Sequence, residues 1–170
     1  MKKNKISLLT EGAMIAAVYA VLTLFFWQFS SMQIQVRISE AMCILPLFTR
    51  SAIPGLAAGC FLINLIMGNL WDAFFGALAT FLGAWITHFI GKKSKRGIAI
   101  LGLIPPIVFN GLIIPLVLYF GYGITVFGEV SGMWAVLAMQ GLSVAIGEAI
   151  ACYGLGIPLY MFIKRSRIFK

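Results

Sequence analysis

Twelve of the thirteen Lys and Arg residues lie in four groups, and long apolar runs separate these groups along the chain. The groups are Lys2, Lys3 and Lys5; Arg50; Lys92, Lys93, Lys95 and Arg96; and Lys164, Arg165, Arg167 and Lys170. A helix that crosses a bilayer needs about 20 apolar residues, so the chain has room to cross and return between successive groups. Because cytoplasmic loops carry the excess of Lys and Arg, the pattern predicts a membrane protein with both termini in the cytoplasm.

The composition supports a membrane protein over a water-soluble one. Apolar residues make up 61% of the chain and charged residues 11%, whereas soluble domains have about 45–50% and about 25%. The net charge of +8 does not indicate nucleic-acid binding, because the basic residues lie at the ends of apolar runs. A nucleic-acid-binding protein gathers such residues on one folded surface.

We expect an all-α integral membrane protein, a compact bundle of six transmembrane helices that forms one transmembrane domain over residues 1–170. The predicted helices cover residues 8–29, 38–48, 53–67, 71–90, 97–120 and 133–163. The first apolar segment has a poor cleavage site and is interpreted as a retained helix. Trp27, Trp71 and Trp134 fall at predicted outer helix ends, as in an aromatic belt.

The second predicted helix is too short to cross a bilayer. Its eleven residues would extend about 16 Å, roughly half the hydrocarbon thickness. Pro46 and Pro54 flank Arg50, which predicts irregular backbone there. Such backbone is tolerated at membrane depth where it is buried in protein or lines a cavity, so we expect a gap for a ligand beside this segment.

The sequence contains no constellation that indicates an enzyme. It lacks a Gly-x-x-x-x-Gly-Lys-Ser/Thr phosphate-binding loop, and His88 is the single histidine. Cys43, Cys60 and Cys152 are far apart and lack zinc-site spacing, so we expect buried, reduced thiols. We therefore expect no catalytic residue, no cofactor and no metal, and any ATP hydrolysis would need separate subunits.

Ionisable residues inside a membrane are functional candidates by default, and Glu148 is the strongest here. It shares a helical face with Gly141 and Ala145, a small surface that favours close contact with another helix. We expect Glu148 to point inward and to accept ligand N–H groups. A hydrogen-bonded structural role is the alternative.

Other polar residues in the apolar runs are candidate ligand contacts. Asp72 begins the fourth helix, either as a charge favoured by the helix dipole or as a ligand contact. Arg37 and Glu40 form either an interfacial ion pair or part of a loop, 30–37, that closes over an external pocket. The amide candidates are Asn64, Gln140 and Asn110, and Pro106 and Pro115 predict a bend near Asn110.

With these features the chain resembles a known family, the substrate-binding S components of energy-coupling-factor (ECF) transporters. The stretch Arg37-Ile38-Ser39-Glu40-Ala41, the following Leu45-Pro46-Leu47-Phe48, and residues 64–76 are similar to the queuosine-precursor transporter (QueT) family. The resemblance covers nearly the whole chain, and the segments 37–48 and 64–80 carry its specificity.

The resemblance implies a function and partners. An S component captures its ligand on the external face and then topples beside a transmembrane T component, while two cytoplasmic ATPases drive release. The implied ligand is a 7-deazaguanine: queuine or its 7-cyano or 7-aminomethyl precursor. Its N–H edge suits a carboxylate, and its flat face suits an aromatic wall from Trp71, Phe74 or Trp134.

The first helix carries the family's Ala-x-x-x-Ala docking motif at Ala13 and Ala17. Gly12, Ala16 and Ala20 form a competing stripe of small residues on the same helix. The sequence does not decide which stripe faces the T component.

Three other functions remain open at this stage. The chain could be an S component for another vitamin, such as a flavin or thiamin. It could be a solitary proton-coupled transporter, with Glu148 as the coupling group. It could also be a membrane scaffold that binds no ligand.

Overall fold

The described part of the chain is helical and contains no strand. The computed structural model describes residues 4–27, 36–93, 98–123 and 132–166. Four helical stretches are long and apolar enough to cross a membrane, and two shorter apolar helices accompany them. This confirms the predicted all-α membrane fold with six helical passes, the second of them short.

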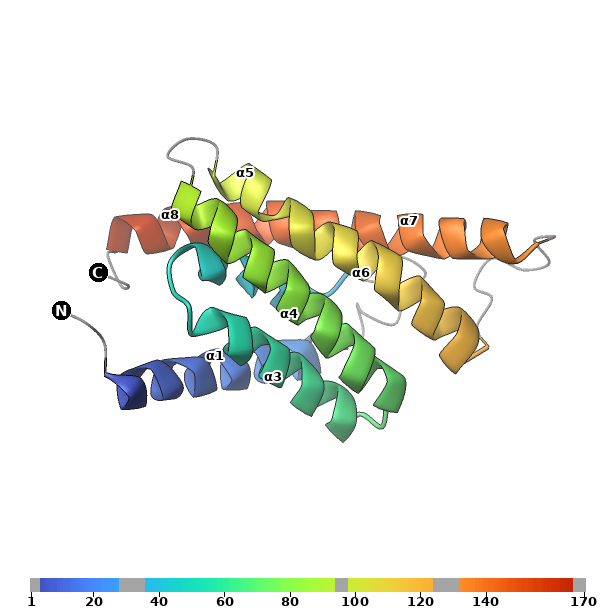
Figure 1. Ribbon diagram of the computed structural model, residues 1–170, viewed down its shortest axis with the longest axis horizontal. Helices are drawn as coiled ribbons and strands as arrows, with labels where there is room; N and C mark the ends of the chain where they lie inside the picture. Colours follow the sequence, from blue (N-terminus) through green and yellow to red (C-terminus); the bar gives the residue numbers. More distant parts are fainter. Residues whose placement is uncertain (1–3, 28–35, 94–97, 124–131, 167–170) are drawn as a thin grey trace.

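Figure 1 shows the order of the elements along the chain. They are α1 (Lys5–Phe25), the 3-10 helix η1 (Ile38–Leu47), α3 (Ala52–Ile66), α4 (Leu70–Lys93), α5 (Ile98–Gly102), α6 (Ile104–Leu116), the π-helix η2 (Val117–Gly121), α7 (Met133–Ala151), the π-helix η3 (Cys152–Gly156) and α8 (Ile157–Ser166).

The described basic groups share one end of the bundle. The start of α1, the start of α3, the end of α4 and the end of α8 all lie toward the left of Figure 1. Lys5 begins α1, Arg50 precedes α3, Lys92 lies in the last turn of α4, and Lys164 lies in the last turn of α8. The even number of crossings expected from the charge pattern therefore agrees with the fold.

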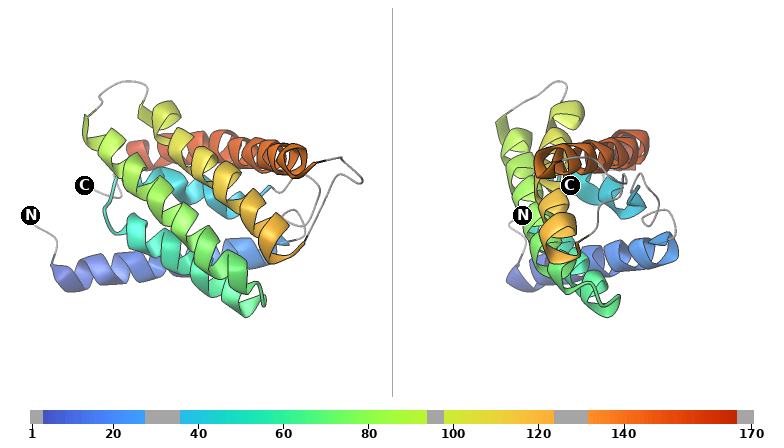
Figure 2. Two further views of the ribbon diagram at one scale, coloured as in Figure 1. Left: turned by 45° about the vertical axis from the view of Figure 1, so that its right-hand side comes forward. Right: turned by 90° about the vertical axis from the view of Figure 1, so that its right-hand side faces the viewer.

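The short second element is the centre of the bundle. Residues Ser39 to Pro46 of η1 are all buried, and η1 packs against α1, α3, α4, α5, α7, η3 and α8 (Figure 2). A 3-10 helix rises about 2.0 Å per residue, so ten residues span about 20 Å. Protein surrounds this segment, which is the setting in which a short non-α element is tolerated at membrane depth.

Two of the predicted helices are interrupted. The fifth breaks at Leu103, between α5 and α6, where Pro105 and Pro106 remove backbone donors. Asn110 lies within the continuous helix α6, between Pro106 and Pro115, and the bend expected there stays a prediction. The sixth changes to the π-helix η3 and then to α8, where Pro158 leaves the Gly154 carbonyl of η3 without its usual donor.

Small residues allow the helices to approach closely. A Cβ added at Gly55 of α3 would lie 2.7 Å from the Gly12 carbonyl oxygen of α1, and one at Gly59 would lie 2.8 Å from the Ala16 carbonyl oxygen. On the other side of the bundle, a Cβ at Gly141 of α7 would lie 2.8 Å from the Gly111 carbonyl oxygen of α6. Close backbone contact through small residues is the usual basis of helix association in membranes.

Gly59→Ala is expected to destabilise the protein by about 1–3 kcal/mol, the range for overpacking a core. The new methyl group would meet the α1 backbone, which cannot rotate away as a side chain can. Gly154→Ala is the matched control, because a Cβ there meets nothing within 4 Å. Melting temperatures in detergent should fall for Gly59→Ala and change little for Gly154→Ala; equal values would show that α1 and α3 are not in close contact.

Candidate functional site

Polar side chains gather inside the bundle while large apolar ones face outward. Leu142 and Phe74 are more than 60% exposed, whereas Glu40, Asn110 and Glu148 are at most 3% exposed. This distribution fits a lipid environment around the protein and a polar site within it.

Two buried carboxylates from distant parts of the sequence form the core of the site. Glu40 lies in η1, and Glu148 lies in α7 one turn before η3. The Cys152 thiol lies between the two residues, 3.5 Å from the Glu40 main-chain carbonyl oxygen and 3.8 Å from the Glu148 carboxylate oxygen Oε2. The prediction that Glu148 points inward is confirmed.

The two carboxylates differ in how fully they are hydrogen-bonded. The Tyr19 hydroxyl of α1 donates to Glu40 Oε1, and the Cys43 thiol donates to Glu40 Oε2 at 2.9 Å. Glu148 receives only the Cys152 thiol at 3.8 Å among the described residues, and a thiol is a weak donor. Glu148 therefore retains acceptor capacity that Glu40 uses within the protein.

An ion pair joins η1 to α4 near the opposite end from the basic groups. Arg37, which caps η1, places a guanidinium nitrogen 3.6 Å from Asp72 Oδ2 in the first turn of α4. The ion pair considered between Arg37 and Glu40 was therefore wrong, because Asp72 supplies the partner and Glu40 turns toward Tyr19. Of the predicted loop 30–37, residues 30–35 lie outside the described residues.

Asp72→Asn is expected to lower the stability by about 1–3 kcal/mol, the cost of leaving a buried polar group without its partner. The Arg37 and Asp72 side chains are 13% and 11% exposed. Little water can therefore solvate the Arg37 charge once its partner is neutral. The double variant Arg37→Met/Asp72→Leu should melt above Asp72→Asn, because it leaves no buried charge unpaired. A double variant that melts no higher than Asp72→Asn would show that the unpaired charge of Arg37 is not the cause of the loss.

The three predicted amide residues are buried in different ways. Asn64 donates from Nδ2 to the Cys60 carbonyl oxygen of its own helix at 2.9 Å. Gln140 is 1% exposed, two turns before Glu148 on α7. Asn110 is also 1% exposed, and its Nδ2 has no hydrogen-bond partner in the described structure.

The aromatic wall predicted from Trp71, Phe74 and Trp134 is not at the polar interior. These side chains are 50%, 63% and 77% exposed. Phe74 packs edge-on against Phe61, and Trp71 stacks against Phe75 in a wholly apolar groove. They face outward because each occupies a lipid-facing position of its helix.

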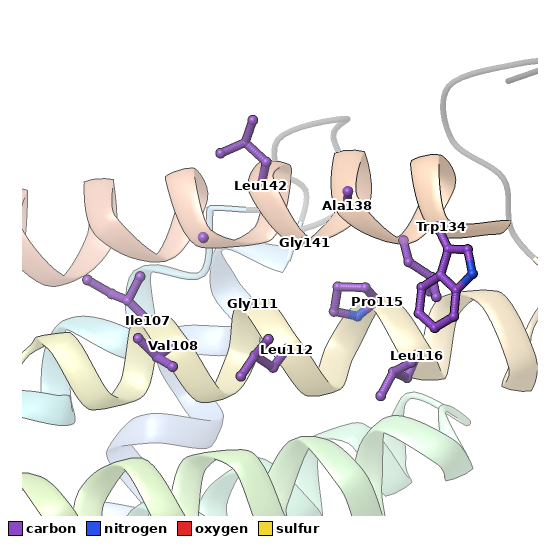
Figure 3. A pocket seen from close by; sticks show the side chains of 12 residues that line it. Ile107, Val108, Gly111, Leu112, Pro115, Leu116, Trp134, Ala138, Gly141 and Leu142 are labelled. Atoms are coloured by element: carbon purple, nitrogen blue, oxygen red, sulfur yellow. The ribbon is translucent and has the colours of Figure 1, made fainter. Parts of the chain in front are cut away.

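Trp134 lies at a second apolar groove, of about 720 Å³, between α6 and α7. Figure 3 shows its ring near Pro115 and Leu116, with Gly111 and Gly141 farther along the groove. Since no polar side chain lines this groove, it lacks the groups needed to orient a polar ligand.

The structure separates the two stripes of small residues on α1. Gly12 and Ala16 pack against Gly55 and Gly59 of α3. Ala13 and Ala17 are exposed on the outer face of α1. A second protein could therefore approach at Ala13 and Ala17 but not at Gly12 and Ala16.

Several residues of the polar interior were missed in the sequence. Cys43 follows Glu40 by three residues, and Cys152 follows Glu148 by four, so each thiol lies one helical turn from a carboxylate. This spacing was a readable signal. Tyr19 gave none, because its partner Glu40 is distant in the sequence.

The polar interior offers groups that could bind a small polar ligand. In the described ranges no cluster of three or more His, Cys, Asp and Glu residues could hold a metal ion. His88 donates from Nδ1 to the Pro46 carbonyl oxygen at 2.8 Å, so it anchors η1. What remains is the buried Glu148 carboxylate, whose acceptor capacity the described residues do not use up.

Comparison with known proteins adds one finding. A family model described as QueT transporter matches residues 9–165, nearly the whole chain. The comparisons with curated proteins and with solved structures found no match.

Proposed function

This chain belongs to the QueT transporter family, and from that premise we propose that it is the S component of an ECF transporter that captures a 7-deazaguanine. The ligand would be queuine or its 7-cyano or 7-aminomethyl precursor. The protein would lie in the plasma membrane with both termini in the cytoplasm, and the ligand would enter from the external face.

The buried, incompletely hydrogen-bonded carboxylate of Glu148 is the observation that carries this proposal. A guanine-type ring presents two adjacent N–H donors, from the ring nitrogen and the exocyclic amino group. A carboxylate accepts such a pair with short, charge-assisted hydrogen bonds. We assign this role to Glu148 and not to Glu40, because both oxygens of Glu40 already accept bonds from Tyr19 and Cys43.

The remaining polar residues support Glu148 from two sides. Glu40 holds η1 to α1 through Tyr19, and Arg37 with Asp72 holds η1 to α4. These contacts keep the start of η1 fixed beside α7. Asn64 and Gln140 line the same interior, whereas Trp71, Phe74 and Trp134 have no ligand contact in the proposal.

Transport would require partners that supply the energy. The transporter family and the absence of a phosphate-binding loop in the sequence support a non-enzymatic role for this chain. We assign the docking of the T component to Ala13 and Ala17, since Gly12 and Ala16 are covered by α3. Two cytoplasmic ATPases would complete the module.

Calorimetry on the purified chain tests the ligand class. We expect 7-aminomethyl-7-deazaguanine to bind at least a hundredfold more tightly than riboflavin or thiamin. Preferential binding of either vitamin would make the chain an S component of different specificity. If none of the three compounds binds, the proposal is wrong.

A further inference from the structure

Two polar side chains in the interior have hydrogen-bond donors that the described protein does not use. Thr80 of α4 and Asn110 of α6 are each 1% exposed. The Thr80 Oγ1 and Asn110 Nδ2 atoms have no hydrogen-bond partner among the described residues that meets normal geometry. Thr80 has the sulfur of Cys60 beside it, and sulfur is a weak acceptor.

The two side chains lie at the same level of the interface between α4 and α6. A Cβ at Gly76 would lie 3.7 Å from Ile114 Cδ1, and a Cβ at Gly83 would lie 2.9 Å from Pro106 Cα. The helices therefore run antiparallel with these pairs opposed. Thr80 lies between the two glycines on α4, and Asn110 lies midway between Pro106 and Ile114 on α6.

Contacts between neighbouring residues link this interface to Glu40 and lead along α7 toward Glu148. Cys60, beside Thr80, also contacts Tyr19, whose hydroxyl donates to Glu40. Asn110 precedes Gly111 on α6. A Cβ added at Gly111 would lie 3.2 Å from the Cβ of Ala145 on α7, so the two helices are in close contact there. Glu148 lies one turn beyond Ala145 on the same helix. The two donors and the carboxylate acceptor therefore come from α4, α6 and α7, where α6 packs against both other helices and η1 packs against α4 and α7.

Unused buried donors are costly, since burial removes the water that would otherwise accept their bonds. Native proteins leave few such groups without a partner. Two of them on facing helices, in a bundle that also buries the Glu148 carboxylate, are complementary to a ligand that presents both an acceptor and donors.

We propose that Thr80 and Asn110 form a donor subsite that binds the ring carbonyl oxygen of the ligand. The inference rests on the proposed function and deepens it, because it names the ligand group that the site recognises, a ring carbonyl oxygen next to the N–H edge. Glu148 accepts from the N–H edge, and Thr80 with Asn110 donate to the adjacent C=O. A ring with the reverse pattern has an amino group next to an unprotonated ring nitrogen. Its amino group, a donor, would face the donors of Thr80 and Asn110, and no hydrogen bond could form.

The test compares two probes that differ at one atom: 7-deazaguanine and 6-thio-7-deazaguanine. The thio compound keeps both N–H donors but replaces the carbonyl oxygen with a weak acceptor. We expect wild type to prefer the oxygen compound by about tenfold, one charge-neutral hydrogen bond being worth about that factor. Asn110→Leu and Thr80→Val should each reduce this ratio toward one, and Thr80→Val keeps the side-chain shape.

Thr87→Val is the matched control, because it removes a buried hydroxyl from the same helix. Its hydroxyl donates to the Gly102 carbonyl oxygen at 2.6 Å, so the ratio of affinities should stay at the wild-type value. If wild type discriminates and both Asn110→Leu and Thr80→Val retain the full ratio, the subsite is wrong while the proposed function stands. If wild type binds neither probe, the proposed function fails and the subsite with it.

Discussion

Glu148→Gln is expected to weaken binding of 7-aminomethyl-7-deazaguanine by tenfold to a hundredfold or more. A hydrogen bond to a charged group contributes about 1.5–3 kcal/mol, and 1.4 kcal/mol corresponds to a factor of ten. The amide keeps the size of the side chain but turns one acceptor oxygen into a donor that faces the ligand's own N–H. The protein should still fold, because a neutral amide is cheaper to bury than a charge.

Calorimetry on both proteins measures this effect, with Glu11→Gln as the control for the chemical change itself. Glu11 lies on α1 and accepts a hydrogen bond from Ser51 at 3.1 Å, away from the polar interior. The control should bind as wild type does. Unchanged affinity in Glu148→Gln would remove Glu148 from the ligand site, and Glu40 and Asp72 would become the leading candidates.

Ala17→Trp is expected to abolish uptake while leaving ligand affinity unchanged. Ala17 is exposed on the outer face of α1, so an indole there meets no residue of this chain's core. It would hold a partner helix away from the small surface that close association needs. The carboxylate site is built on η1 and α7, and the substitution does not alter it.

Uptake of labelled ligand by cells and binding by the purified variant separate the two steps. Leu142→Trp is the matched control, since Leu142 is an exposed residue of α7, away from α1. This control should take up ligand normally. Normal uptake by both Ala13→Trp and Ala17→Trp would show that the T component docks elsewhere.

The fold could be predicted wherever the relevant signal was local in sequence. Charge at the ends of apolar runs gave the number of crossings, because each group orients its own helix ends. The central position of η1 could not be predicted, since it depends on contacts with helices from both halves of the chain. Its shortness predicted a gap for a ligand beside it, and that gap stays a prediction.

The site residues could likewise be predicted where the signal lay within one helix, and not where it depended on contacts between distant segments. Burial of Glu148 followed from its spacing to Gly141 and Ala145, which is a property of one helix. The ion-pair partner of Arg37 could not be predicted from spacing within one helix, because Asp72 lies 35 positions away and Glu40 is nearer in the sequence. Trp71 and Trp134 were placed at the correct end of the bundle but on the wrong side of their helices, since apolar aromatics suit lipid and interior alike.

The two stripes on α1 show the limit most clearly. Both have small residues four positions apart, and sequence spacing alone treats them as equivalent. Gly55 and Gly59 of α3 decide between them by covering Gly12 and Ala16. The proposed docking face at Ala13 and Ala17 therefore follows from packing and not from sequence spacing.

Uptake into proteoliposomes tests the central claim most directly. The chain is reconstituted alone, or with its T component and two ATPases, and uptake of labelled 7-aminomethyl-7-deazaguanine is followed with and without ATP. We predict uptake only when the complete module and ATP are both present, and none from the chain alone under a proton gradient. Proton-driven uptake by the chain alone would contradict the account and identify a solitary transporter, with Glu148 as its coupling group.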